Sequence, residues 1–281
     1  MIPATPRRIL ITGASSGIGA ALARAYAEAG AVLHLGGRDE DRLSAVGARC
    51  REWGAKAFTR IQDVTDRSGM ARWIAEAHAD GGLDLVIANA GVSGRTSAPA
   101  DGNGALSNAE GQRQLREVMT VNIDGVVNTV FPALEHMLAN AADRPRGGQI
   151  AIMSSLAGYR GFSDAPGYCA SKAAVKVLGE GLRGMAARHG IGVTVICPGF
   201  IRTPMTENNP FPMPFLMESD RAAAIIKTGL ARNRARISFP WPLAAMVWCL
   251  AALPPSWVDA LSKRVSGEPA APRRSAMTKS R

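Results

Sequence analysis

The sequence predicts an α/β fold, a doubly wound parallel sheet with helices on both faces, as a single domain with a C-terminal extension. Short apolar runs alternate with longer helix-forming stretches, and a glycine-rich turn joins the first run to an alanine-rich stretch. Such alternation is typical of parallel strands connected by helices. The predicted strands span residues 7–12, 31–36, 57–61, 84–88, 149–154 and 192–197, and a final segment is harder to place.

The first strand leads into a turn at residues 12–19, with the sequence T-G-A-S-S-G-I-G. Residues 20–29, which follow, are rich in alanine and other strong helix formers. Glycines in such a turn let the backbone approach a pyrophosphate, which the unpaired N–H groups of the helix N-terminus then bind. Glycine clusters also make plain turns, but the strand-to-helix context favours a nucleotide cofactor.

Each of the six predicted strands is followed by a residue that can contact a ligand. The residues found just past a predicted strand are Gly13, Arg38, Asp63, Asn89, Ser155 and Pro198. Because ligands of open parallel sheets bind at the carboxyl ends of the strands, these positions predict one shared cleft.

Tyr168, Lys172 and Ser155 predict a proton-transfer site. Tyr168 and Lys172 are four residues apart and share one face of a predicted helix. A nearby ammonium group lowers the pKa of a phenol from its ordinary value of ~10 toward the neutral range. The Ser155 hydroxyl, thirteen residues before the tyrosine, would hold a substrate oxygen. Alone, this Tyr and Lys spacing is also compatible with an amphipathic surface helix.

Over roughly residues 7–205, the chain resembles the classical short-chain dehydrogenase/reductase family in the order of its motifs. The matching motifs are T-G-x-x-x-G-x-G at 12–19, N-A-G at 89–91, V-N-x-x-G at 121–125, Ser155, Y-x-x-x-K at 168–172 and P-G-x-x-x-T at 198–203. This resemblance implies a Rossmann-like fold, a nicotinamide cofactor and oxidoreductase activity. Members of the family are commonly dimers or tetramers, so a homo-oligomer is among the implied partners.

The resemblance also implies a role for each matching residue. The catalytic residues would be Asn122, Ser155, Tyr168 and Lys172, with Asn122 anchoring a water that leads to Lys172. Asp63 and Val64 match positions where relatives contact the adenine ring. The full set of implied cofactor contacts is Gly13, Ser15, Ser16, Gly17, Ile18, Gly19, Arg38, Asp63, Val64, Asn89, Ala90, Gly91, Tyr168, Lys172, Pro198, Gly199 and Thr203.

Gly37 and Arg38, at the end of the second predicted strand, indicate the nucleotide preference. NAD-dependent relatives usually carry an acidic residue near the Gly37 position, where it binds the ribose hydroxyls and repels a 2′-phosphate. No acid stands there in this chain, and the Arg38 guanidinium suits a phosphate. NADP(H) is therefore favoured over NAD, although Asp39 stands beside Arg38 and an ordinary loop arginine is the alternative.

The basic excess of the chain lies at its C-terminus. Residues 221–281 carry eleven Lys or Arg and two acidic residues, which accounts for nine of the ten net positive charges. The apolar run 243–253 has eleven residues, too few for a transmembrane helix, which needs roughly 20. With its tryptophans and basic flanks, the segment 237–264 suits an anionic membrane surface, or it packs on the domain or in a subunit interface. No motif for reading nucleic acid accompanies the charge.

These features divide the chain into three parts. Residues 1–220 form the NADP-binding and catalytic domain, 221–266 form a basic and apolar extension, and 267–281 are expected to be a disordered basic tail. The four cysteines lack metal-ligand spacing, so no metal site is predicted. We expect them to be reduced thiols in a cytoplasmic protein, and one alternative is that this protein is peripheral at a membrane. No secretory signal is recognised near the N-terminus, because polar and glycine residues interrupt its apolar run.

An apolar segment after Pro198 indicates the character of the substrate. Its apolar and proline residues are Met205, Phe211, Pro212, Met213, Pro214, Phe215, Leu216 and Met217. They either cover an apolar ligand or pack the segment onto the rest of the protein. The sequence therefore predicts an NADP-dependent oxidoreductase that interconverts a ketone or aldehyde and an alcohol, with a hydrophobic or lipid-like substrate as one hypothesis. A non-catalytic NADP-binding sensor or a membrane-peripheral scaffold of the same fold are the alternatives.

Overall fold

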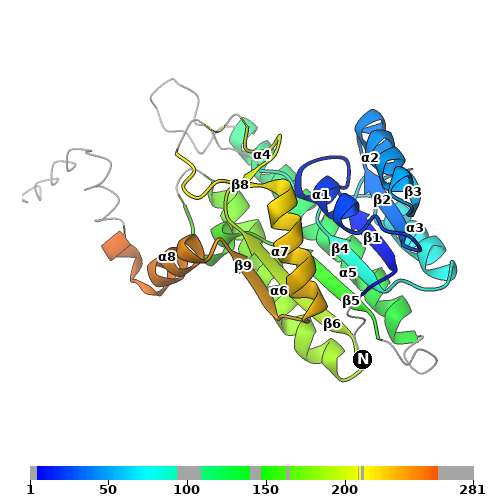
Figure 1. Cartoon of the computed structure of the whole chain (residues 1–281). Coiled ribbons are helices and arrows are strands. Elements are labelled where there is room, and N and C mark those ends of the chain that lie inside the picture. Colours follow the sequence, from blue (N-terminus) through cyan, green and yellow to red (C-terminus); the bar gives the residue numbers. More distant parts are fainter. Residues whose placement is uncertain are drawn as a thin grey trace, which may run out of the picture.

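Seven parallel strands form the central sheet of this protein, of which the computed structural model describes residues 5–93, 109–139, 147–162, 165–207, 209 and 212–258. The strand order is β3-β2-β1-β4-β5-β6-β9 (Figure 1). The strands are β1 (Arg8–Thr12), β2 (Val32–Gly37), β3 (Lys56–Ile61), β4 (Leu85–Ala88), β5 (Gln149–Met153), β6 (Gly192–Pro198) and β9 (Arg236–Phe239). The predicted doubly wound parallel fold is confirmed, and each of the six predicted strands is present.

The core lies on both faces of the sheet because side chains alternate along each strand. In β1, Ile9 and Ile11 belong to one apolar cluster and Leu10 to the other. All three side chains are fully buried. The inner strands are therefore largely apolar, which is why they are recognisable in the sequence as apolar runs, whereas in the edge strand β3 only Ala57 is buried.

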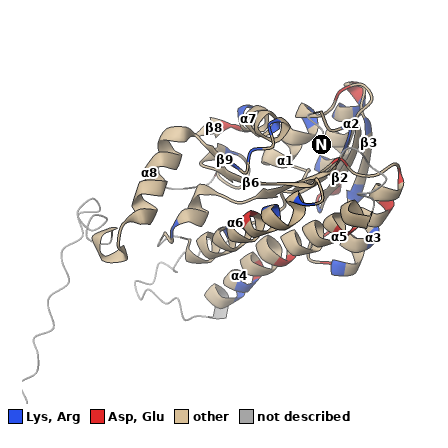
Figure 2. Ribbon diagram, turned by 90° about the horizontal axis from the view of Figure 1, so that it is seen from below, with Lys and Arg blue, Asp and Glu red and all other residues tan. Residues whose placement is uncertain are grey.

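Helices cover both faces of the sheet, as the view in Figure 2 shows. One face carries α1 (Gly17–Ala25), α2 (Glu40–Glu52) and α7 (Ser219–Ala231). The other carries α3 (Arg67–Ala79), α5 (Gly125–Ala139) and α6 (Pro166–Ala187), with α4 (Ala109–Met119) beside α6. Two short turns matter for the site: a π-helical turn, η1 (Thr120–Asp124), between α4 and α5, and a 3-10 turn, η2 (Leu156–Tyr159), after β5.

The C-terminal part of the chain first adds the last strand of the sheet and then continues beyond the sheet. α7 packs on α1, and β9 pairs in parallel with β6, with Ile237 and Phe239 buried in the core. Residues 221–239, assigned above to an extension, thus belong to the same domain as the other six strands. Among the described residues that follow β9, α8 (Trp241–Ala252) and 253–258 lie beyond the sheet, and the predicted tail 267–281 lies outside the described residues.

Candidate active site

A tight turn between β1 and α1 forms one wall of a cavity of about 540 Å³. Gly13 and Gly17 have φ angles of 65° and 53°, which favour glycine. A Cβ on Gly19 would lie 2.1 Å from the carbonyl oxygen of Gly13, so only a glycine lets the first turn of α1 pack back on the end of β1. The backbone of this turn is therefore open to a ligand in the cavity.

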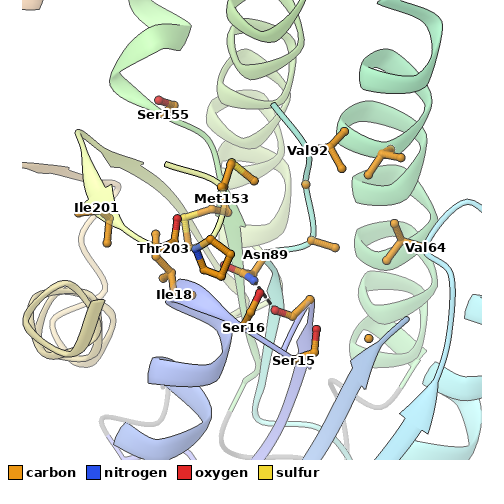
Figure 3. A pocket seen from close by; sticks show the side chains of 18 of the residues that line it. Ser15, Ser16, Ile18, Val64, Asn89, Val92, Met153, Ser155, Ile201 and Thr203 are labelled. Atoms are coloured by element: carbon orange, nitrogen blue, oxygen red, sulfur yellow. Dashed lines mark hydrogen bonds between the residues drawn. The ribbon is translucent and has the colours of Figure 1, made fainter. Parts of the chain in front are cut away.

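The start of α1 directs unpaired N–H groups toward this cavity. Ser16 precedes the helix in an extended conformation, and its side chain does not cap the N-terminus of α1. No acidic residue stands in the first turn of α1, all of which the structure describes. Ser15, Ser16 and Ile18 line the cavity (Figure 3). Free amides at the positive end of a helix dipole bind phosphate, so this cradle fits the pyrophosphate of a dinucleotide.

Thr12 and Asn89 join the glycine turn to the end of β4. The Thr12 hydroxyl oxygen accepts hydrogen bonds from the backbone N–H groups of Asn89, at 3.0 Å, and Ala90, at 3.1 Å. In return, the Asn89 side-chain amide donates to the carbonyl oxygens of Thr12, at 3.0 Å, and Gly13, at 3.2 Å. The N-A-G motif thus braces the phosphate cradle, and Ala90 and Gly91 continue along the cavity wall.

Two arginines line the cavity near the ends of β2 and β3. Arg38 is largely exposed, and its guanidinium lies 4.0 Å from the Asp63 carboxylate. Arg42 forms an ion pair with Asp39 at 2.7 Å, and Asp39 also accepts the Arg42 backbone N–H as the N-cap of α2. The Asp39 carboxylate is therefore occupied, which removes the acidic competitor that stands beside Arg38 in the sequence. Val64 is buried next to Asp63 and also lines the cavity.

Ser155 and Tyr168 come to the cavity from different elements. Ser155 precedes η2, where its hydroxyl oxygen accepts the Ala157 backbone N–H at 3.1 Å. Tyr168 stands in the first turn of α6 and lines the cavity together with Ser155. Burial raises the pKa of Tyr168, and the nearby Ser155 hydroxyl opposes this effect only in part. The phenol is therefore protonated at neutral pH in the free protein.

Lys172 lies one helical turn beyond Tyr168 and is almost fully buried. Its ammonium donates to the carbonyl oxygen of Met153 at 2.9 Å and lies 5.7 Å from the centre of the Tyr168 ring. Burial lowers the pKa of Lys172 from 10.5 to about 8. The expectation that Lys172 lowers the pKa of Tyr168 is wrong for this structure, because burial dominates at both groups and disfavours the charged form of each.

Asn122 lies in the π-helical turn η1, a rare backbone form that often occurs at functional sites. Its amide bonds both backbone groups of Val92, at 2.8 and 2.9 Å, and donates to the Ser171 hydroxyl at 2.9 Å. Ser171 in turn donates to the carbonyl oxygen of Tyr168 at 2.8 Å. Asn122 is not among the residues that line the cavity, and its hydrogen bonds place it as a brace between the segment that follows β4 and α6. Its predicted role in holding a water stays a prediction.

The chain after β6 forms the remaining wall. Pro198, Gly199 and Thr203 line the cavity as predicted, and Figure 3 shows Thr203 and Ile201 between Ser155 and the start of α1. The short strands β7 (Ile201–Arg202) and β8 (Met217–Glu218) pair in parallel and hold the two ends of the apolar segment together. Met217 packs in the core, whereas Met205 lines the cavity. Phe211 lies outside the described residues.

All of the predicted site residues except Gly19 and Asn122 line this one cavity. The lining residues that the sequence interpretation did not name for the site are Arg42, Gln62, Val92, Val121, Met153, Ser154, Ile201, Pro204 and Thr206. Most of them adjoin a motif residue, and Arg42 stands in the first turn of α2, four residues after Arg38, where a second basic residue could have been noticed in the sequence. Among the described residues, no three His, Cys, Asp or Glu side chains gather into a set that could hold a metal ion.

A doubly wound sheet with a phosphate cradle and a Ser, Tyr and Lys around one cavity defines a Rossmann-type oxidoreductase. The chain belongs to the short-chain dehydrogenase family, whose model, described as short chain dehydrogenase, matches residues 7–211. An oxidoreductase of Myxococcus xanthus (strain DK1622), itself uncharacterised, is 36% identical over 260 residues, which cover 92% of this chain and 97% of that protein.

Solved structures agree with this assignment. The crystal structure of a short-chain type dehydrogenase/reductase from Mycobacterium marinum is similar with a TM-score of 0.71 and 27% identity, and the match covers 84% of this chain and 94% of that one. A short-chain dehydrogenase from Sphingobium yanoikuyae in complex with NADPH has a TM-score of 0.70 and 25% identity. That match covers 96% of this chain and 98% of the other.

Proposed function

We propose that this protein is an NADP-dependent oxidoreductase that interconverts a ketone or aldehyde and an alcohol. The observation that carries the proposal is that Ser155, Tyr168 and Lys172 share one cavity with the phosphate cradle at the start of α1. The NADPH complex of the Sphingobium yanoikuyae relative supports a nicotinamide cofactor.

The cavity offers contacts along the whole length of an extended dinucleotide. The α1 amides around Ser16 and Gly17 would bind the pyrophosphate, and Asp63 and Val64 would contact the adenosine. Arg38, with Arg42 beside it, would bind the 2′-phosphate through charge-assisted hydrogen bonds. Because Arg42 is already paired with Asp39, the largely exposed Arg38 is the feature of the cavity that supports NADP over NAD.

Ser155 and Tyr168 would handle the reacting oxygen. When bound, the nicotinamide supplies the hydride for the carbonyl carbon in one direction and accepts it in the other. The two hydroxyl groups donate hydrogen bonds to the substrate oxygen, where negative charge develops during reduction. Because its pKa is raised, Tyr168 is protonated and can transfer its proton to that oxygen. The charged form of Lys172 then stabilises the phenolate, and Asn122 keeps the predicted water route to Lys172 in place.

An apolar substrate fits the side chains near the reacting groups. Val92, Met153, Ile201 and Met205 are apolar residues that line the same cavity as Ser155 and Tyr168. Apolar walls exclude water and strengthen the polar contacts to the substrate oxygen. We therefore expect turnover of ketones to rise with the length of their apolar chain, in a panel graded from small and polar to long-chain and assayed with NADPH and with NADH.

The substitution Tyr168→Phe tests the proton donor. It should lower kcat by about 10²- to 10⁴-fold, the usual contribution of a general acid, while NADPH binding changes little. Turnover is measured by NADPH oxidation and binding by the fluorescence of NADPH. Tyr159→Phe is the matched control, because the Tyr159 hydroxyl bonds Ser238 and does not line the cavity. Near-normal turnover by Tyr168→Phe would show that Tyr168 is not the acid.

A further inference from the structure

An uncharged and largely apolar segment ends the described chain. Residues 240–258 contain no Lys, Arg, Asp, Glu or His. They include α8, which lies at the end of the molecule beyond β9 and is tan along its whole length in Figure 2, whereas charged residues mark the other long helices. A surface element without any charge is unusual for a water-exposed helix, which normally has a polar outer face.

α8 has an anchored face and an exposed face, and both are apolar. Leu243 and Val247 are each 5% exposed and pack in a small core with residues of η2 and β6. On the outer side, Trp241 is 77% exposed, Trp248 is 63% exposed and Met246 is 49% exposed. Positions 241, 245, 248 and 252 form one stripe along a helix, which here consists of two tryptophans and two alanines.

The exposed face is held in place. Arg160 donates to the carbonyl oxygens of Leu250, at 2.8 Å, and Leu253, at 3.1 Å, so it satisfies the C-terminal end of α8. At the other end, a Cβ on Gly199 would lie 2.7 Å from the Leu243 side chain, so α8 approaches the active-site loop closely. The tryptophans therefore project from a helix fixed to the domain.

The basic residues on either side of the apolar segment indicate which kind of partner the exposed face of α8 can bind. Arg232, Arg234 and Arg236 precede it and are exposed, although Arg236 is paired with Glu180. After it, residues 259–281 contain six Lys or Arg and two acidic residues. Exposed tryptophans between basic segments match the interface of a bilayer that carries anionic lipid, where Trp lies at the headgroups and each basic residue is attracted to the surface. Within the described chain, no helix combines the length and apolar character needed to cross a membrane.

We propose that α8 and the residues up to 258 dock on the surface of an anionic membrane, with Trp241, Trp248 and Trp257 in the headgroup region. Docking at this place has a consequence for the site. α8 packs against Leu156 and Phe200, the residues that directly follow Ser155 and Gly199. The membrane would thus contact the catalytic end of the cavity rather than the Arg38 end, and a substrate dissolved in lipid would have a short path to Ser155. The docking does not depend on the reaction proposed above.

Vesicle binding by the full-length protein tests the proposal. Phosphatidylcholine vesicles are compared with vesicles that also contain phosphatidylglycerol, in a flotation assay at low and high salt. We expect binding to the anionic vesicles only at low salt, with about fivefold weaker binding for each basic contact that salt screens. Trp248→Glu should weaken that binding by more than about tenfold, because it places a charge on the face that enters the interface.

Trp53→Glu is the matched control, because Trp53 is 44% exposed at the end of α2, on a different part of the surface. It should bind vesicles like the unchanged protein, and NADPH binding should be the same in both variants. The proposal is overturned if Trp248→Glu binds anionic vesicles normally. It is equally overturned if the unchanged protein binds no vesicles and Trp248→Glu instead dissociates a dimer in sedimentation experiments, since α8 would then cover a second copy of this chain. Neither result bears on turnover, which is measured separately.

Discussion

At the scale of single residues, the buried ammonium of Lys172 destabilises the free protein and is also the charge proposed to act in the reaction. Its ammonium is buried with one hydrogen bond, to Met153, and burial lowers its pKa to about 8. In the free protein this charge therefore costs stability, because a buried cation with few partners lies in an unfavourable environment. The same charge is the group that would stabilise the Tyr168 phenolate during turnover. The position of Lys172 thus favours the proposed reaction and lowers the free energy of unfolding of the free protein.

Lys172→Met should therefore make the protein more stable and inactive. We expect the free energy of unfolding near neutral pH to rise by roughly 1–3 kcal/mol. Between pH 8 and 10.5, the unfolded chain binds a proton at Lys172 that the folded chain has lost, so the stability of the unchanged protein rises with pH in this window. The advantage of the variant should shrink above about pH 8, as urea unfolding at a series of pH values would measure.

Lys176→Met provides the comparison one turn further along α6. Lys176 is less buried than Lys172 and pairs with Glu180 at 3.7 Å. Removing a pair near the surface changes stability by less than about 1 kcal/mol. A loss of stability in Lys172→Met as large as that of an ordinary core substitution would contradict the proposed cost of the buried charge.

Arg38 should determine the choice between NADPH and NADH. Arg38→Asp removes the proposed phosphate ligand and places a carboxylate where it would repel a 2′-phosphate. We expect kcat/KM for NADPH to fall about 10- to 100-fold, the range for a hydrogen bond to a charged group, and kcat/KM for NADH to fall much less. Arg49→Asp, on α2 but outside the cavity, should change neither value. Equal losses with both cofactors would show that Arg38 does not read the phosphate.

At the scale of elements, the approach of η2 to α6 sets the distance between Ser155 and Tyr168. A Cβ on Gly158 would lie 2.7 Å from the backbone carbonyl of Lys172, so η2 can lie against α6 only with glycine at this position. The Ser154 hydroxyl donates to the same carbonyl oxygen at 2.7 Å and fixes the contact. Two elements that are remote in sequence are thereby held in one geometry.

Gly158→Ala should push η2 away from α6 and lower kcat more than about tenfold, with a loss of roughly 1–3 kcal/mol in the free energy of unfolding from the steric clash. NADPH affinity should change less, because the phosphate cradle belongs to α1. Gly161→Ala is a close control, since no atom of the described residues lies within 4 Å of the Cβ it would add. Steady-state kinetics and thermal unfolding on both variants would decide the matter, and equal behaviour of the two would count against this role for Gly158.

At the scale of the whole molecule, the sequence predicted the sheet well and its last strand poorly. Of the six early strands, all except the edge strand β3 are almost wholly buried, because helices cover both of their faces, and such largely apolar runs are recognisable without any partner. β9 has four residues, begins with an exposed arginine and, among the described strands, pairs only with β6. The pairing of β9 depends on contacts with residues distant in the sequence, and a local sequence pattern does not predict such contacts. For the same reason, no local pattern predicts the hydrogen-bond partners of Asn122, which come from the segment after β4 and from α6.

The site was predictable because its motif residues stand at the ends of strands, which the parallel topology brings together. Its electrostatics were not. Spacing alone indicates that Lys172 lies near Tyr168, but the degree of burial, which reverses the expected shift in the Tyr168 pKa, depends on the packing of α6 against β5 and η2. Met217 shows the same limit, since an apolar residue in a loop can cover a ligand or fill the core, and here it fills the core.

The small core that joins α8 to the active-site loops can form only late in the synthesis of the protein. The residues of the phosphate cradle leave the ribosome early, but about 90 residues separate Leu156, beside the catalytic serine, from Leu243, against which it packs. Translation starts at the N-terminus, and domains fold as their residues emerge. The loop that carries Ser155 therefore gains its final support only when α8 has been made. A nascent chain that stops short of α8 would hold the catalytic loop through its contacts with α6, without the apolar contact of Leu156 with Leu243.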